Sequence, residues 1–118
     1  MLTIEKISDL LKDLRRKTET GEIQWSPFMK QKNEKDVVGF YTSLNGTKFK
    51  IFHTLWDNKS LTLKAKVRND DDESYTVRLA SITSTPALND ELFDLKTAVI
   101  LANRKIPEWA EQALFGEN

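Results

Sequence analysis

The dipeptide Asn45-Gly46 constrains the fold of this 118-residue chain more than any other feature. It separates two runs of residues with high β-propensity, 37–44 and 47–55. Asn-Gly is the preferred pair for a two-residue type I′ turn, because both central residues need a positive φ, and such a turn fixes the strand register. The predicted pairs are Leu44–Thr47, Thr42–Phe49, Phe40–Ile51 and Val38–His53 on the apolar face, and Tyr41–Lys50 and Gly39–Phe52 on the opposite face.

Three further segments read as strands, over 23–28, 60–68 and 74–83. Pro27 cannot donate a ladder hydrogen bond, so the first of them belongs at a sheet edge, with Ile23 and Trp25 pointing inward. The polar stretch 29–36 predicts a mobile loop. Alternation predicts an inward set of Leu61, Leu63, Ala65, Val67, Tyr75, Val77 and Leu79, and an outward set of Thr62, Lys64, Lys66, Arg68, Thr76 and Arg78.

Helical periodicity appears at both ends of the chain. Residues 3–20 form an amphipathic pattern that begins at the capping residue Thr3 and stops at Gly21. A second pattern covers 90–104, and Pro107 is suited to open a last helix over 107–115. We expect Asn89 or Asp90 to cap the second helix, a buried stripe of Leu92, Leu95, Val99 and Ala102, and a short final helix carrying Trp109, Ala113 and Leu114.

Together these elements predict an α+β fold in two layers, with the order α-β-β-β-β-β-α-α. An N-terminal helix and two C-terminal helices cover the apolar face of a five-stranded antiparallel meander. The length, with 39% hydrophobic and 31% charged residues, predicts a single domain over 1–118. No apolar run is long enough to span a bilayer and no secretory signal is recognisable, so we expect a cytoplasmic protein.

Catalytic chemistry has little support in the sequence. There is no cysteine, and the four glycines are isolated, so thiol catalysis and phosphate-binding glycine loops are excluded. The only histidine, His53, falls on the inward side of its strand, where it is expected to be structural. The acidic run 70–73 lacks the ligand spacing of a calcium loop and is expected to be a solvated hairpin tip. We therefore expect a non-enzymatic protein without a cofactor or metal.

The distribution of charge is more informative than the net charge, which is zero. Residues 45–69 carry six basic and one acidic residue, whereas 70–118 carry four basic and ten acidic residues. The strand pattern directs the basic residues outward, beside two aromatic residues. This pattern defines a candidate binding face on the outer side of the sheet, formed by Tyr41, Lys48, Lys50, Phe52, Lys64, Lys66, Arg68 and Arg78.

Three interpretations of this face remain open. It can be an ordinary solvated surface, protected against edge pairing by lysine. It can bind an acidic protein, which the neutral net charge favours; this is the interpretation that we expect, and it predicts an inhibitor or adaptor. It can bind single-stranded nucleic acid, with bases stacked on rings and cations along phosphates. A concave groove where the lysines converge with Tyr41 would favour nucleic acid, and a flat face packed on a second copy would favour assembly.

The tryptophans and the acidic C-terminal half are the sequence features relevant to oligomerisation. We expect Trp25 and Trp109 to be buried, and Trp56, which has outward parity at a strand end, to be a candidate interface anchor. The acidic half of one chain can cover the basic face of another, which makes a homodimer compatible with the pattern.

The helix followed by Gly21-Glu22-Ile23-Gln24-Trp25, then Tyr41-Thr42, Asn45-Gly46 and Phe49, then a leucine-rich closing helix, resembles a loose group of small uncharacterised bacterial and phage-borne proteins. In that group a G-x-I-x-W segment links a first helix to a β-meander. Pro107 and Trp109 depart from the simpler helical ending of the group. The resemblance implies a bacterial or phage setting and a role in host–virus conflict, and it transfers no catalytic residue.

Overall fold

The computed structural model describes residues 1–30, 33–54 and 57–116. Its five strands form one antiparallel sheet in chain order, β1-β2-β3-β4-β5, so the predicted α+β fold with one N-terminal and two C-terminal helices is confirmed. The elements are α1 (Ile4–Glu19), β1 (Ser26–Lys30), β2 (Asn33–Leu44), β3 (Thr47–Thr54), β4 (Asp57–Arg68), β5 (Ser74–Ser81), the 3-10 turn η1 (Pro86–Leu88), α2 (Asn89–Asn103) and α3 (Glu108–Phe115).

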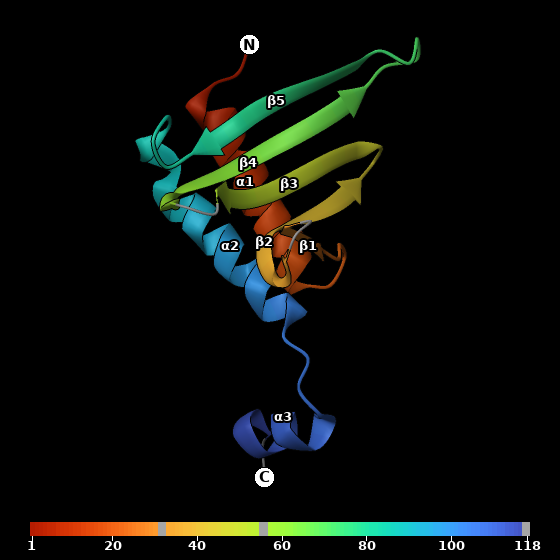
Figure 1. The fold of residues 1–118 in the computed structure, drawn as a ribbon, viewed down its shortest axis with the longest axis vertical. Coiled ribbons are helices and arrows are strands. Elements are labelled where there is room, and N and C mark those ends of the chain that lie inside the picture. The colour runs from red at the N-terminus through yellow and green to blue at the C-terminus, as the bar shows by residue number, and fades with distance from the viewer. Residues whose placement is uncertain (31–32, 55–56, 117–118) are drawn as a thin grey trace.

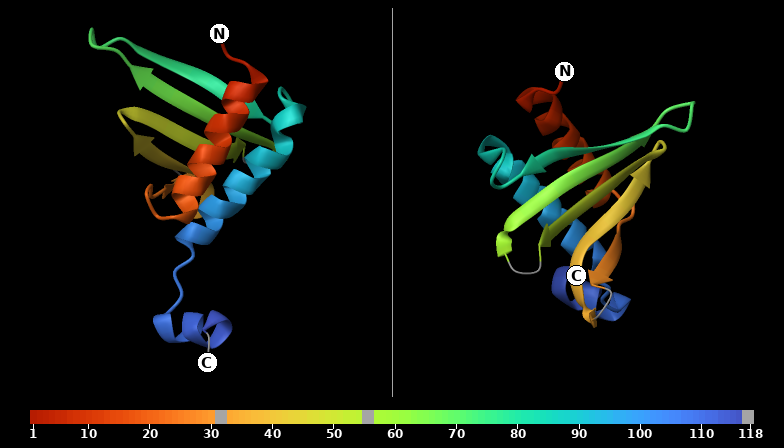
Figure 2. Two further views of the ribbon diagram at one scale, coloured as in Figure 1. Left: turned by 180° about the vertical axis from the view of Figure 1, so that it is seen from behind. Right: turned by 45° about the horizontal axis from the view of Figure 1, so that its top comes forward.

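Two of the three helices cover one face of the sheet. Helices α1 and α2 lie side by side behind the strands in Figure 1, and Figure 2 shows them from their own side. The core fills the space between these two layers. It consists of Ile7, Leu11, Leu14, Ile23, Trp25, Phe49, Ile51, Leu61, Leu63, Ala65, Leu79, Ala80, Leu88, Leu92, Leu95 and Val99.

The central hairpin has the predicted register from Gly39–Phe52 to Leu44–Thr47. Asn45 and Gly46 have φ values of 52° and 80°, as a type I′ turn requires. The turn places Phe49 and Ile51 in the core, where they are 6% and 2% exposed, and leaves the intervening Lys50 on the opposite face. The sixth predicted pair, Val38 with His53, is not among the pairs that the structure describes.

The connection from α1 to the sheet is held by a chain of hydrogen bonds. Gly21 ends the helix with φ of 80°. Trp25 Nε1 donates to Thr18 Oγ1 at 2.8 Å, and Thr18 Oγ1 donates to the Leu14 carbonyl at 2.7 Å. Thr42 Oγ1 on β2 donates to the carbonyl of Gln24 at 2.6 Å. Trp25 is therefore buried as predicted, with its one polar atom satisfied by α1.

The mobile loop predicted over 29–36 is wrong. Residues 29 and 30 continue β1, which is an edge strand as Pro27 indicates, and residues 33–36 belong to β2. The two strands pair as far as Lys30 opposite Asn33, with two irregularities in register. Backbone pairing at a sheet edge tolerates polar side chains on both faces, so this part of the hairpin carries no alternation that a pattern search can detect.

Helix α2 begins differently from the prediction. The chain enters it through η1, and the N-cap position is Leu88, which makes no side-chain cap. Asn89 and Asp90 already lie inside the helix, and Asn89 Oδ1 is buried without a hydrogen-bond partner among the described residues. Leu92, Leu95 and Val99 are buried as expected, with Ala98 beside them.

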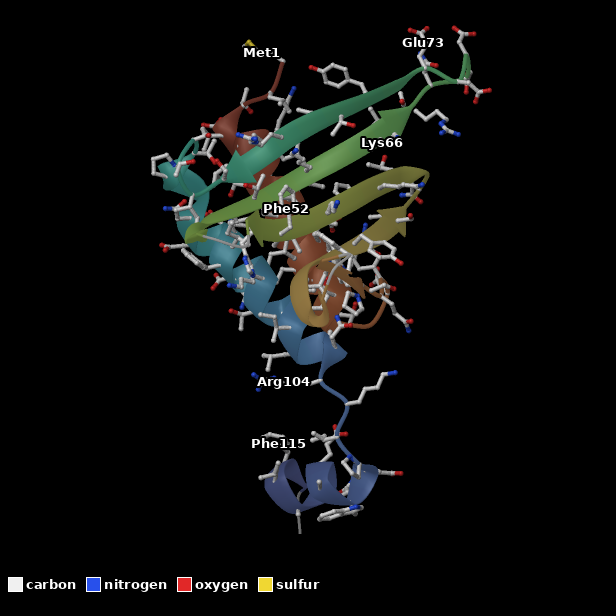
Figure 3. The ribbon with its side chains drawn as sticks, in the orientation of Figure 1. Met1, Phe52, Lys66, Glu73, Arg104 and Phe115 are labelled. Atoms are coloured by element: carbon white, nitrogen blue, oxygen red, sulfur yellow. The ribbon has the colours of Figure 1, made fainter. Side chains whose placement is uncertain are left out.

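The last turn of α2 and the whole of α3 leave the core. Ala102 is exposed rather than buried, and Trp109 is 75% exposed, so its predicted burial is wrong. Helix α3 buries none of its residues and stands apart beyond the end of α2 (Figures 1 and 3). Residues 104–107 between the two helices have no regular structure, and this segment carries the apolar side chains of α3 away from the sheet.

The β4–β5 hairpin extends beyond the helices (Figure 1). For this reason Val67 and Tyr75, which have inward parity, are 41% and 68% exposed. The tip is ordered locally, because Asn69 Oδ1 accepts the backbone N–H groups of Asp71 and Glu73 at 3.0 Å each. No helix in the described ranges is long and apolar enough to cross a membrane.

Helix α1 carries a small ionic cluster on its exposed side. Asp13 contacts Arg16 at 2.8 Å and Lys17 at 2.9 Å, at i+3 and i+4 spacing. Hydrogen bonds from Lys17 and Arg16 hold the pKa of Asp13 below its ordinary value of 3.8. A carboxyl group whose pKa is lower in the folded state stabilises that state at pH values above its unfolded pKa. This contribution is lost as the pH falls through the folded pKa.

We therefore expect Asp13→Asn to lower the thermal unfolding midpoint slightly near neutral pH, because exposed ion pairs contribute little. The difference from the wild type should shrink as the pH is lowered toward about 3, where carboxylates become protonated. Circular dichroism melts across this pH range measure it. Asp9→Asn, on the same helix and in none of the ion pairs described for it, is the control. A difference that stays constant with pH would contradict the prediction.

Candidate ligand-binding face

The sheet face opposite α1 and α2 carries most of the predicted binding residues, and we call it the outer face. The pairing registers place one set of side chains on it, because alternate residues of paired strands point to the same side. In the described strands the set includes Phe28 on β1, Tyr41 on β2, Lys48, Lys50 and Phe52 on β3, Lys64, Lys66 and Arg68 on β4, and Thr76 and Arg78 on β5.

Cations of the outer face lie opposite one another across the strands. Lys50 is paired with Lys64, and Lys48 with Lys66. Lys64 is in turn paired with Arg78 on β5. Like charges directly opposite in a sheet are destabilising. The face therefore concentrates positive charge at a cost to the fold.

Among the residues whose side chains the structure describes, no acidic group forms an ion pair with these cations. The ion pairs that the structure describes all involve Arg15, Arg16 or Lys17 of α1. The nearest acidic run in the sequence, 70–73, is at the tip of the β4–β5 hairpin, where Figure 3 labels Glu73. Charge on the outer face is thus left for solvent ions or for a ligand.

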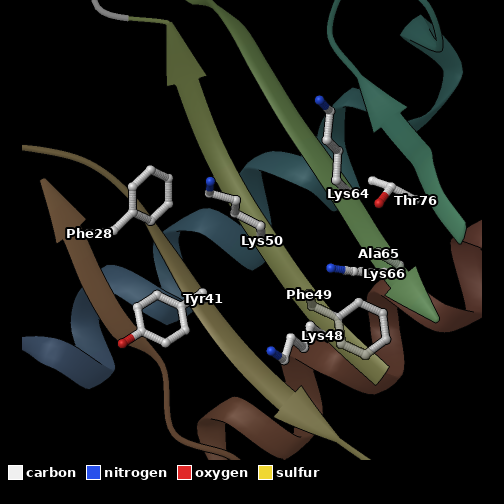
Figure 4. Close-up of a pocket in the computed structure, with 9 residues that line it drawn as sticks. All are labelled: Phe28, Tyr41, Lys48, Phe49, Lys50, Lys64, Ala65, Lys66 and Thr76. Carbon is white, nitrogen blue, oxygen red and sulfur yellow. The ribbon is translucent and has the colours of Figure 1, made fainter. Parts of the chain in front are cut away.

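The centre of the face is hollowed. A cavity of about 480 Å³, open to solvent, lies over β2, β3 and β4. Figure 4 shows four lysine side chains and Tyr41 around it, with Phe28 at one side. Tyr41 is 50% exposed, so its ring is available to a ligand. The lining residues are Phe28, Tyr41, Lys48, Phe49, Lys50, Lys64, Ala65, Lys66 and Thr76.

Two phenylalanines hold the lysines at one end of the hollow. The rings of Phe28 and Phe52 are 6.4 Å apart between centroids and tilted by 58°. Lys50 Nζ lies 4.2 Å from the centroid of Phe28, and Lys64 Nζ lies 5.4 Å from that of Phe52. Ammonium groups within about 6 Å of a ring centroid are attracted to its face. The rings therefore position two cations that would otherwise move freely.

Gly39 makes this aromatic pair possible. It is opposite Phe28 on one side and Phe52 on the other. A Cβ atom at position 39 would lie 2.7 Å from Phe28 Cε1 and 2.6 Å from Phe52 Cβ, and it would also clash with the carbonyl oxygen of Ile51. The absence of a side chain at Gly39 lets both rings close over the strand.

The structure brings together part of the predicted set. Tyr41, Lys48, Lys50, Lys64 and Lys66 line the hollow. Phe52 lies beside it through its contact with Phe28, whereas Arg68 and Arg78 share the outer face by register but do not line the cavity. Trp56, the candidate interface anchor, is outside the described residues.

Sequence reasoning missed four lining residues: Phe49 and Ala65, which have inward parity, and Phe28 and Thr76. Phe28 ends the predicted strand 23–28, but its position depends on the β1–β2 register, which no recognisable turn sequence indicates. The sequence did indicate the position of Thr76, because this residue has outward parity; in the structure it pairs with Lys66. A register for the β4–β5 hairpin would have placed it at the edge of the hollow.

Outside the outer face, the described residues provide few groups suited to catalysis or to metal binding. His53 is half-buried and lines a smaller cavity of about 230 Å³ between the sheet and α2, together with Lys96. Within the described ranges, no group of three or more His, Cys, Asp or Glu residues is arranged to hold a metal ion. The outer face is therefore the strongest candidate site that the described residues provide.

Comparisons of the chain with protein-family models, with curated proteins and with solved structures find no match. The resemblance to small bacterial and phage-borne proteins stays a prediction, and the site rests on its own geometry.

Gly39→Ala should destabilise the protein by about 1–3 kcal/mol, because overpacking forces displacement of Phe28, Phe52 or the β3 backbone. Chemical denaturation followed by tryptophan fluorescence measures the free energy of unfolding. Ser43→Ala, on the exposed outer side of the same strand, is the matched control and should change stability by less than about 0.5 kcal/mol. Equal stability of the two variants would show that the two rings do not require the glycine.

Proposed function

We propose that this protein is a non-enzymatic binding module whose outer face holds single-stranded nucleic acid. The observation that supports this proposal is the hollow in which four lysines converge with the exposed ring of Tyr41. Proteins that bind single strands without sequence preference combine a positively charged groove with aromatic platforms on which bases stack. Both features lie here on one open sheet.

The chemistry of the cations also supports a phosphate ligand. Lysine and arginine neutralise phosphates at many positions along a strand. Lysine is depleted in the cores of protein–protein interfaces, where aromatic residues and arginine are enriched. Four of the nine lining residues are lysines, so the hollow suits a flexible polyanion better than a close-packed protein surface.

An acidic protein is the second candidate for the outer face. The observation that favours it is the net charge of zero, since nucleic-acid-binding domains are typically basic overall. In that case the protein acts as an inhibitor or adaptor, and Tyr41 is the anchoring side chain. For either ligand, we propose a cytoplasmic protein of bacterial or phage origin that acts by binding its partner rather than by catalysis.

Charge reversal with Lys50→Glu and Lys66→Glu should weaken binding to a labelled oligonucleotide by about tenfold or more in fluorescence anisotropy. For the wild type, the logarithm of affinity should fall with the logarithm of salt concentration, with a slope near −0.7 for each phosphate contacted. The double variant should show a shallower slope. Lys6→Glu with Lys12→Glu changes the net charge equally on exposed positions of α1 and should leave the affinity within about twofold.

Two results would contradict the nucleic-acid proposal. One is a wild type that does not bind single strands at low salt. The other is an equal loss of affinity in the outer-face variant and in the α1 variant.

Tyr41→Ala should cost about 1–3 kcal/mol of binding free energy, because a stacked base loses its platform. Tyr41→Phe retains the ring and should bind nearly as well as the wild type. The comparison separates stacking from charge, since neither substitution changes the number of cations. Equal affinities of the Ala and Phe variants would exclude stacking on this residue.

A further inference from the structure

The large apolar side chains of helix α3 are all exposed. Trp109, Leu114 and Phe115 are 75%, 68% and 76% exposed, and Ile106 just before the helix is 47% exposed. None of the helix residues is buried. Isolated helices shorter than about 12–15 residues are marginal in water, and α3 has 8 residues. Its stability therefore depends on a surface that covers its apolar side chains.

The charge of α3 indicates which surface fits. The helix carries Glu108 and Glu111 in its first turn and no basic residue. Two copies of α3 packed together would bring like charges close to each other. The outer face is complementary in both respects, since it offers the rings of Phe28 and Tyr41 and lysines that form no ion pair among the described side chains. Aromatic side chains on both surfaces provide the apolar part of such a contact.

The short connection between α2 and α3 restricts the access of α3 to its own hollow. Four residues, 104–107, span at most about 14 Å. Helix α2 ends on the other side of the sheet (Figure 2), so the chain would have to pass around the β1 edge. Beyond that edge, two strand spacings alone take about 10 Å. A second molecule meets no such restriction.

We propose that α3 is an arm that docks on the outer face of a second copy of this chain. Trp109 and Phe115 would lie against the rings of the hollow, and Glu108 and Glu111 would face its lysines. Reciprocal exchange of two arms gives a closed dimer with two-fold symmetry. The same face is the proposed nucleic-acid site, so a bound strand and a docked arm would exclude each other. The dimer itself requires no nucleic acid.

Sedimentation equilibrium of the full chain, treated with nuclease, tests the proposal. The wild type should form dimers that dissociate as salt increases. Variant A, with Lys50→Glu and Lys66→Glu, and variant B, with Glu108→Lys and Glu111→Lys, should each have a dimer dissociation constant raised by about tenfold or more. An equal mixture of A and B should dimerise again, because the acidic arm of A meets the basic face of B.

A second measurement tests the apolar contact. Trp109→Ala with Phe115→Ala should also raise the dissociation constant by about tenfold or more, since buried aromatic anchors dominate interfaces. Two controls should dimerise as the wild type does: Lys6→Glu with Lys12→Glu, and Phe93→Ala on α2, which removes another exposed aromatic ring. Circular dichroism verifies that each variant is folded.

Three results would overturn the inference: a wild type that stays monomeric at high concentration and low salt, a dimer that persists in both A and B, or a mixture of A and B that stays monomeric. These experiments distinguish a failure of the arm proposal from a failure of the nucleic-acid proposal. A monomer that binds oligonucleotides contradicts only the arm, and a dimer that binds none contradicts only the nucleic-acid proposal.

Discussion

The register of the β2–β3 hairpin is the constraint on which the rest of the structure depends. Asn45 and Gly46 accept the positive φ values of the turn, and their position in the chain decides which residues of both strands face the helices. A shift by one residue would place Phe49 and Ile51 in solvent and Lys50 in the core. Strands β1 and β4 then pair on either side of this hairpin and inherit its two faces.

One consequence of that register is a sheet with two chemically opposite surfaces. The helix side contains the apolar core, whereas the outer side aligns cations across three strands without an acidic partner among the described residues. Aromatic contacts with Phe28 and Phe52 hold two of these cations in place, and Gly39 provides the space for both rings. The repulsion within the face is a cost that a bound polyanion or an acidic arm would offset.

Local signals predicted most of the fold and most of the candidate site. The turn at Asn45 and strand alternation were sufficient to place Tyr41 and the lysines on one face. What failed were features set by distant contacts. The polar part of the β1–β2 hairpin has no alternation, so the sequence predicts a loop there. Trp109 has the composition of a core residue, but the segment before it carries α3 away, and no local pattern encodes that direction. The concave shape and the contribution of Phe28 required a register that only the pairing of β1 supplies.

Charge is distributed unevenly over the molecule although its net charge is zero. Positive charge is concentrated on one side of the sheet, and negative charge lies at the hairpin tip and on α3. A neutral particle of this kind does not attract an anion from all directions. It turns an approaching polyanion toward one side before contact, over roughly the 8–10 Å that screening allows in physiological salt. Encounters are thereby oriented without the indiscriminate adhesion of a highly basic protein.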